Sequence, residues 1–149
     1  MTLENVLVAV DDEEASRERA LAQAAIDIAG AAGATVRLAH VFDREEYQRL
    51  RERLEFGADS EATPDAIAKR QNVVRDLGDA LEAAGVAFTW YGGIGETGET
   101  IVELAEDLDA DLIIVGGRKR SPTGKAVFGS TAQEVMLNAP CPVTFVREE

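Results

Sequence analysis

The chain has 149 residues, of which 46% are hydrophobic and 29% charged, a composition typical of a globular domain and not of a disordered segment. Its 28 acidic and 15 basic side chains give a net charge of -13, which disfavours nucleic acid and anionic membranes as partners. No run of about 18 apolar residues occurs and the first residues resemble a strand, so we expect neither a membrane-spanning helix nor a secretory signal.

Strand-like hydrophobic segments alternate with helical patterns along the chain. The predicted strands cover residues 6–10, 35–42, 86–91, 112–115 and 142–146. The predicted helices cover residues 14–32, 47–56 and 64–84, a segment that begins at Thr100 or holds it in its first turn, and a segment from Gly129 through Leu137. Gly33 and Gly85 are expected to end two of these helices, and Pro64 suits the first turn of another.

This order of elements predicts the fold class. The first and fourth predicted strands are unbroken apolar runs, which indicates that both faces of the sheet are covered. Alternating strands and helices predict right-handed crossovers and an open, doubly wound parallel sheet with helices on both faces, which is an α/β fold. Because no linker, repeat or low-complexity tract interrupts the pattern, we expect residues 1–149 to form a single domain.

Unusual residues gather just after the first and fourth predicted strands, where doubly wound sheets bind their ligands. Residues 112–133 contain no acidic side chain, but they include the cations Arg118, Lys119, Arg120 and Lys125. On a strongly anionic chain, such a cationic segment is what an anionic ligand needs.

Glycines flank this cationic segment on both sides. Gly116 and Gly117 allow the backbone to approach a ligand closely. Gly129, Ser130 and Thr131 open a helix, whose free N–H groups and hydroxyl donors favour negative charge. The pattern therefore predicts a phosphate-binding loop. A solvated basic loop followed by a helix that Ser130 or Thr131 caps would explain the same residues.

Two further residues stand at predicted strand ends. Asp11 can accept hydrogen bonds from a ribose hydroxyl, an adenine amino group or metal-bound water, and it can equally cap the helix that follows. Val41 can form an apolar wall for a base, or it can belong to the core.

Several segments match those of a known family. They are Val8-Ala9-Val10-Asp11, Leu38-Ala39-His40-Val41, residues 110–116, Phe128-Gly129-Ser130-Thr131-Ala132 and Ala139-Pro140-Cys141-Pro142-Val143. On these residues the chain resembles the universal stress protein family over essentially its whole length, and the last two segments are the most specific.

The resemblance implies a five-stranded parallel sheet, with the strand order 3-2-1-4-5, and typically a homodimer formed through the last strand, from Val143 to Val146. Many members bind ATP through a glycine, two residues, a second glycine, nine residues, and a third glycine followed by Ser or Thr. Gly116, Gly129 and Ser130 match this motif, whereas Lys119 stands where the second glycine belongs. A lysine there places a side chain where the backbone would lie against the phosphates. It either marks the loss of the nucleotide site or adds a phosphate contact of its own.

The resemblance also implies roles for individual residues. By similarity, Asp11 and Val41 contact the adenosine of ATP, and Mg²⁺ is expected to accompany the phosphates. The full set of expected nucleotide-binding residues is Ala9, Val10, Asp11, Val41, Gly116, Gly117, Arg118, Lys119, Gly129, Ser130 and Thr131.

The expected function is a stress-response module that binds ATP, or a related adenine nucleotide, at the switch between strands one and four. The alternative is a dimeric interaction protein of the same fold that binds no nucleotide. His40 is the only histidine, which leaves little for a catalytic triad or a multi-histidine metal site. We therefore predict no catalytic and no metal-binding residue, and at most a weak ATPase.

Two compositional features bear on the environment of the protein. The single cysteine, Cys141, cannot form an internal disulfide, so we expect a cytoplasmic location. Twelve arginines against three lysines, together with the excess of carboxylates, indicate adaptation to high salt, where counterions screen self-repulsion. An ordinary acidic protein from a genome that favours Ala, Gly and Arg explains the composition equally well.

Overall fold

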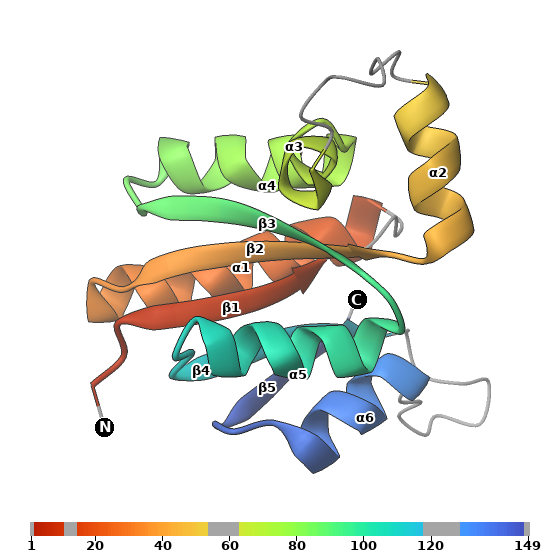
Figure 1. Ribbon diagram of the computed structural model, residues 1–149. Coiled ribbons are helices and arrows are strands. Elements are labelled where there is room, and N and C mark those ends of the chain that lie inside the picture. Colours follow the sequence, from red (N-terminus) through yellow and green to blue (C-terminus); the bar gives the residue numbers. More distant parts are fainter. Residues whose placement is uncertain (1, 11–14, 54–62, 118–128, 148–149) are drawn as a thin grey trace, which may run out of the picture.

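The computed structural model describes residues 2–10, 15–53, 63–117 and 129–147, which contain a five-stranded parallel sheet in the order β3-β2-β1-β4-β5 (Figure 1). The strands are β1 (Asn5–Val10), β2 (Thr35–Phe42), β3 (Phe88–Ile94), β4 (Leu112–Gly117) and β5 (Val143–Arg147). The helices are α1 (Ala15–Ala32), α2 (Arg44–Arg53), α3 (Pro64–Lys69), α4 (Asn72–Ala83), α5 (Thr97–Asp107) and α6 (Ser130–Asn138). The predicted doubly wound α/β fold and its strand order are confirmed.

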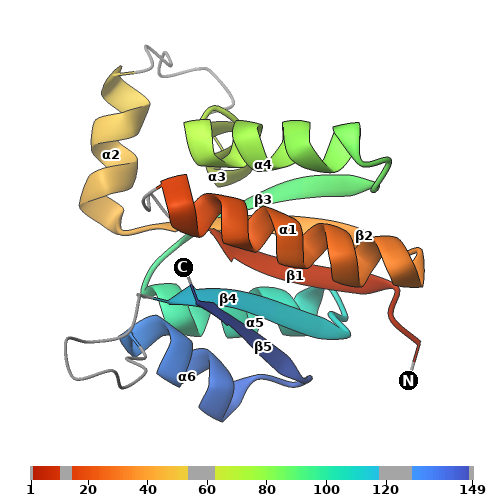
Figure 2. The same ribbon diagram turned by 180° about the vertical axis from the view of Figure 1, so that it is seen from behind.

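Helices cover both faces of the sheet (Figure 1, Figure 2). α1 and α4 pack on one face, over Val6, Val8 and Val10 of the central strand β1. α5 and α6 pack on the other face, over Leu7 and Ala9. Successive side chains of a strand point to opposite faces, so a strand covered on both sides has no place for a polar residue. This is why an unbroken apolar run predicted the central strand.

One continuous helix over residues 64–84 was expected, and this prediction is wrong. The chain forms α3 and α4, and Gln71 between them is extended, with φ -72° and ψ 136°. The two helices bury their apolar side chains in different places. Ile67 of α3 packs with Phe42 at the end of β2, whereas Leu77 of α4 joins the core beneath α1. One straight helix cannot reach both clusters, so the chain breaks between them.

The third strand was predicted over residues 86–91, but β3 starts later and continues through Gly92 and Gly93. Both glycines lie where a neighbouring element approaches too closely for a side chain. A Cβ on Gly92 would lie 2.0 Å from the carbonyl oxygen of Pro64 in α3, and a Cβ on Gly93 would lie 2.6 Å from Cγ2 of Thr100 in α5. The glycines therefore continue the strand and do not end it.

The start of α5 is set by a carboxylate. Glu96 is the N-cap, and its side chain accepts hydrogen bonds from the N–H groups of Gly98 and Glu99 at 3.1 and 2.8 Å. Thr100 consequently lies in the first turn, which is one of its two predicted positions. Its hydroxyl donates to the carbonyl oxygen of Glu96 at 2.7 Å.

The other predicted elements are present with ends shifted by a few residues. The largest shift is in α2, which was expected over residues 47–56 and begins at Arg44. It begins early because the carboxylate of Asp43 accepts a hydrogen bond from the N–H of Glu46 at 2.7 Å. None of the helices in the described ranges is both long and apolar enough to cross a membrane.

Candidate functional site

The carboxyl ends of β1 and β4, which we call the switch point, lie where the winding of the chain reverses. The chain passes from β1 to β2 and β3 on one side, then crosses to β4 on the other side of β1 (Figure 1). The ladder between β1 and β2 reaches Val10 and His40, whereas the described ladder between β1 and β4 ends at Val8 and Ile114. Described pairing of β1 with β4 therefore stops short of the ends where doubly wound sheets bind ligands.

Asp111 ties the opposite ends of the same two strands together. Its Oδ2 accepts hydrogen bonds from the N–H groups of Asn5 and Glu4, both at 2.9 Å. These two bonds favour the charged carboxylate and hold the pKa of Asp111 below its ordinary value. The amino ends of β1 and β4 are thus fixed beside each other.

Three expected site residues lie at the ends of β1 and β2. Val10 is 3% exposed and points into the core beneath α1, so only its backbone can face a ligand at the switch point. Ala9 and Val41 point to the opposite face of the sheet, toward α5. Val41 is 8% exposed and packs in that core, as one of its two interpretations predicted. A base would reach only the small part of Val41 that remains exposed.

Gly116 and Gly117 are the last two residues of β4. A Cβ on Gly117 would lie 2.0 Å from Cζ of Phe145, so this glycine is required for the packing of β5 against β4. The sequence interpretation gave Gly117 a ligand-binding role alone, because its contact with Phe145 is distant in the chain and leaves no local signal. Gly116 is half-buried and pairs with Val146.

Among the described residues, the N-terminus of α6 has no side-chain cap. Its N-cap is Gly129, with φ -69° and ψ 166°, so the expected alternative of Ser130 or Thr131 as the cap is wrong. The first N–H groups of the helix have no intrahelical partner, and within the described ranges they have no side-chain acceptor either. A Cβ on Gly129 would meet no described atom within 4 Å. Such N–H groups, at the positive end of the helix dipole, attract anions.

Part of the expected site lies outside the described residues. This holds for Asp11, for Arg118 and Lys119, and for the further cations Arg120 and Lys125. The cationic segment and the lysine in place of the second motif glycine therefore stay predictions from the sequence.

Sequence reasoning missed an acidic cluster between α5 and α6. Carboxylate oxygens of Glu96, Glu99 and Glu134 lie within 4.8 Å of one another. They meet because Gly98 lets the helices approach, since a Cβ there would lie 2.6 Å from Cγ of Glu134. Glu96 and Glu99 are exposed, and Glu96 already serves as the N-cap of α5. Exposed acidic groups are common without an ion, so we assign this cluster no ligand.

His40 pairs with Val10 beside the switch point but is buried, and Cys141 lies near Asp111 at the opposite ends of the strands. His40 is 2% exposed, and its ring lies 4.5 Å from that of Phe42. Cys141 is half-buried, and burial, aided by the charge of Asp111, raises the pKa of its thiol. A thiol with a raised pKa is protonated at neutral pH, which makes it a poor nucleophile.

Fold and site together define a doubly wound α/β fold in which no described side chain caps the helix N-terminus at the switch point. A family model described as the universal stress protein family matches residues 2–147. The chain therefore belongs to the universal stress protein family, as its sequence motifs predicted.

Individual relatives agree with this assignment. The chain is 34% identical over 88 residues to a universal stress protein of Mycolicibacterium smegmatis, in an alignment that covers 58% of this chain and 68% of that protein. A universal stress protein structure from Archaeoglobus fulgidus matches with a TM-score of 0.69 and 28% identity, over 96% of this chain and 98% of that chain. Another from the same organism, solved in complex with dAMP, shares the fold with a TM-score of 0.65 and 23% identity, over 98% and 99% of the two chains.

Proposed function

We propose that the chain binds an adenine nucleotide, with ATP as the physiological ligand, at the switch point between β1 and β4. The observation that carries this proposal is the N-terminus of α6, where Gly129 is the N-cap and, among the described residues, no side chain caps the first N–H groups. The dAMP bound to the Archaeoglobus fulgidus relative supports an adenine nucleotide as the class of ligand.

In this proposal the two ends of the nucleotide contact different elements. Asp11 and the exposed edge of Val41 contact the adenosine, beside the backbone of Ala9 and Val10. The ribose and phosphates lie against Gly116, Gly117, Gly129, Ser130 and Thr131. Arg118 or Lys119 adds charge-assisted hydrogen bonds to the phosphates, which Mg²⁺ accompanies.

The proposed role is ligand-dependent regulation in a stress response, without rapid turnover. Asp11 is assigned to the nucleoside, too far from the terminal phosphate to activate a water molecule there. Any ATP hydrolysis is therefore expected to be slow.

Isothermal titration with ATP and Mg²⁺ in a high-salt buffer tests the proposal. We expect a Kd in the micromolar range, equivalent to about -8 kcal/mol. A millimolar Kd, or no heat of binding, contradicts it and favours the dimeric interaction protein that binds no nucleotide. Phosphate release faster than the buffer background would show that the chain is also an ATPase.

We also propose a homodimer formed through β5, from Val143 to Val146. β5 is an edge strand, and Ile113 of β4 donates its N–H to the carbonyl oxygen of Pro142 at 3.0 Å. In a parallel ladder this register directs the N–H of Thr144 toward β4 and that of Val143 away from the sheet. The N–H and C=O of Val143 then face away from β4, where a second copy can pair with them.

Proline has no N–H, so proline substitutions test the outward N–H of Val143 and the inward N–H of Thr144 separately. Val143→Pro removes an outward donor and is expected to weaken the dimer at least about tenfold, as measured by sedimentation velocity. Thr144→Pro is the matched control. It removes a donor to β4, so it is expected to lower the thermal midpoint of unfolding in addition to any effect on the dimer. A wild-type monomer, or an unchanged dimer in the Val143→Pro variant, contradicts the proposal.

Two further expectations belong with this function. We propose a cytoplasmic location, which the single free cysteine supports. We also propose that residues 1–149 form one domain, because the described strands all join one sheet.

A further inference from the structure

A cavity opens between α4 and β3, away from the switch point. Its volume is about 420 Å³, within the range of small-ligand sites. β3 is an edge strand that β2 separates from β1, and the cavity shares no lining residue with the switch point. We propose that this cavity is a second ligand site and that it binds a free amino acid with an apolar side chain, in its zwitterionic form.

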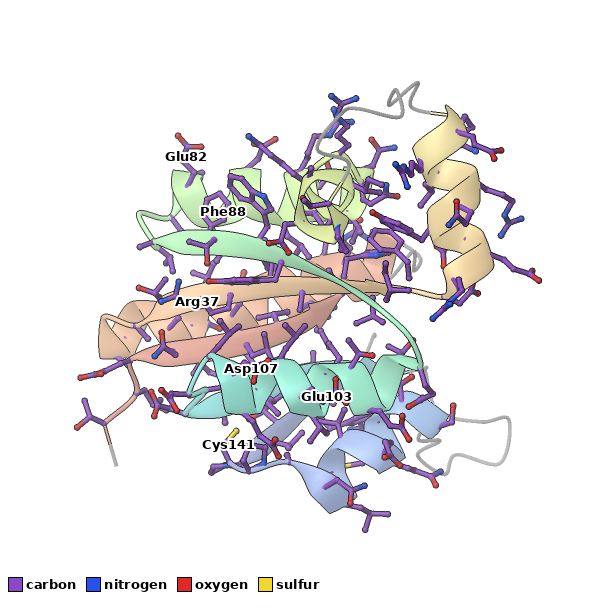
Figure 3. The ribbon with its side chains drawn as sticks, viewed as in Figure 1. Arg37, Glu82, Phe88, Glu103, Asp107 and Cys141 are labelled. Carbon is purple, nitrogen blue, oxygen red and sulfur yellow. The ribbon has the colours of Figure 1, made fainter. Side chains whose placement is uncertain are left out.

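Aromatic and apolar side chains form the inner wall of the cavity. Trp90 and Phe88 of β3 are half-buried on the side of the sheet that α4 covers, and Val74 of α4 lies beside them. Phe88 lies between β3 and α4 (Figure 3). A Cβ on Gly78 would be 2.8 Å from Cε2 of Phe88. A glycine inside a helix costs about 1 kcal/mol relative to alanine, but here it lets the ring lie against α4. The wall therefore offers contact area to an apolar or aromatic side chain.

Charges of both signs surround this wall, namely Lys69, Arg75, Asp76 and Asp79. Nζ of Lys69 lies 4.6 Å from the ring centroid of Trp90, and Arg75 donates a hydrogen bond to Asn72. Asp76 lies near Glu18, another acid, on α1, and burial together with the neighbouring Asp76 raises the pKa of Glu18. Across the described part of the chain, none of the four makes an ion pair. All four side chains are exposed, and within the described residues two cations and two anions line one cavity without an ion pair between them.

Unpaired charges of both signs favour a ligand that carries both. The carboxylate of an amino acid would pair with Lys69 and Arg75, and its ammonium group with Asp76 and Asp79. Its side chain would then pack on the rings of Trp90 and Phe88. A ligand with a single charge would satisfy one pair and leave the other unpaired, so it is expected to bind more weakly.

Trp90 is the only tryptophan of the chain, so its fluorescence reports on this cavity alone. We expect a saturable change in Trp90 emission on titration with L-phenylalanine, excited where phenylalanine does not absorb. Phenethylamine lacks the carboxylate and 3-phenylpropionate lacks the ammonium group. Each is expected to bind at least about tenfold more weakly. No saturable change below about 10 mM L-phenylalanine, or equal binding of 3-phenylpropionate, would overturn the proposal.

Charge-removing variants test the same contacts by equilibrium dialysis with radiolabelled L-phenylalanine. Lys69→Ala and Asp79→Asn are each expected to weaken binding at least about tenfold. The matched controls Arg53→Ala and Asp107→Asn, at exposed positions outside the cavity, should leave it unchanged. Equal losses in all four variants would overturn the proposal. ATP binding should be unaffected in each variant, so a failure here is distinguishable from a failure of the proposed nucleotide site.

Discussion

Gly92→Ala is expected to lower the free energy of unfolding by about 3 kcal/mol, near the upper end of the usual effect of overpacking. The added Cβ would lie 2.0 Å from the carbonyl oxygen and 2.3 Å from the carbonyl carbon of Pro64. These are backbone atoms of α3, so no side-chain rotation can relieve the contact. The N–H of Gly92 also donates to Oδ1 of Asp65 at 2.6 Å, which joins β3 to α3 at the same point. The shift of the urea midpoint measures the loss.

Gly129→Ala is the matched control for this variant. Gly129 has a φ of -69°, which any residue can adopt, and a Cβ there would meet no described atom within 4 Å. Its free energy of unfolding, obtained from the urea midpoint, is expected to stay within about 0.5 kcal/mol of wild type. If Gly92→Ala unfolds at the same urea concentration as Gly129→Ala, α3 does not pack against β3 as described.

The fold was largely predictable because the information for it is local. Buried parallel strands need apolar residues on both faces, so the runs at Val6–Leu7–Val8 and Ile113–Ile114 identified their strands without knowledge of the rest. The strand order came from the family resemblance, which rests on short motifs at the strand ends. Neither inference required side-chain contacts between distant segments.

Where the predictions failed, the cause is a contact between segments far apart in the chain. From the sequence alone, Gly92 is predicted to end its strand, because its contact with Pro64 is not visible there. Gln71 is likewise predicted to be helical, because the sequence does not show that α3 and α4 pack in different clusters. Gly117 shows the same limit at the site, since its lack of a side chain accommodates Phe145. A glycine can indicate that another segment packs closely against the backbone, but the sequence alone does not identify that segment.

The sequence placed the described candidate residues at the strand and helix ends where the structure has them, but it did not give the directions of their side chains. The motif identified Gly129 at the start of a helix, and the structure has it there as the N-cap. Val10 was grouped with the ligand-binding residues, although it belongs to the same face as Val6 and Val8 and is buried with them. Alternation along β1 was the available signal, because residues two apart in a strand share a face.

Gly129→Glu is expected to weaken ATP binding about 100-fold, equivalent to about 2.7 kcal/mol, in the same titration with Mg²⁺. Its carboxylate would stand before the uncapped N–H groups of α6, where the proposal places the phosphates, and would compete with them for those donors. The fold should tolerate the change, because the position is exposed, its backbone is extended, and an acid favours a helix N-terminus.

Two variants at the same position separate charge from size. Gly129→Ala adds a Cβ without charge and should keep the affinity within a few-fold of wild type. Gly129→Lys adds length with the opposite charge and should bind ATP at least as well as Gly129→Ala, with a steeper loss of affinity as salt is added. If Glu and Lys weaken binding equally, bulk and not electrostatics governs the site. If neither Gly129→Glu nor Gly129→Lys changes the affinity, ATP does not bind at the N-terminus of α6. The uncapped helix end would then no longer support the proposed function.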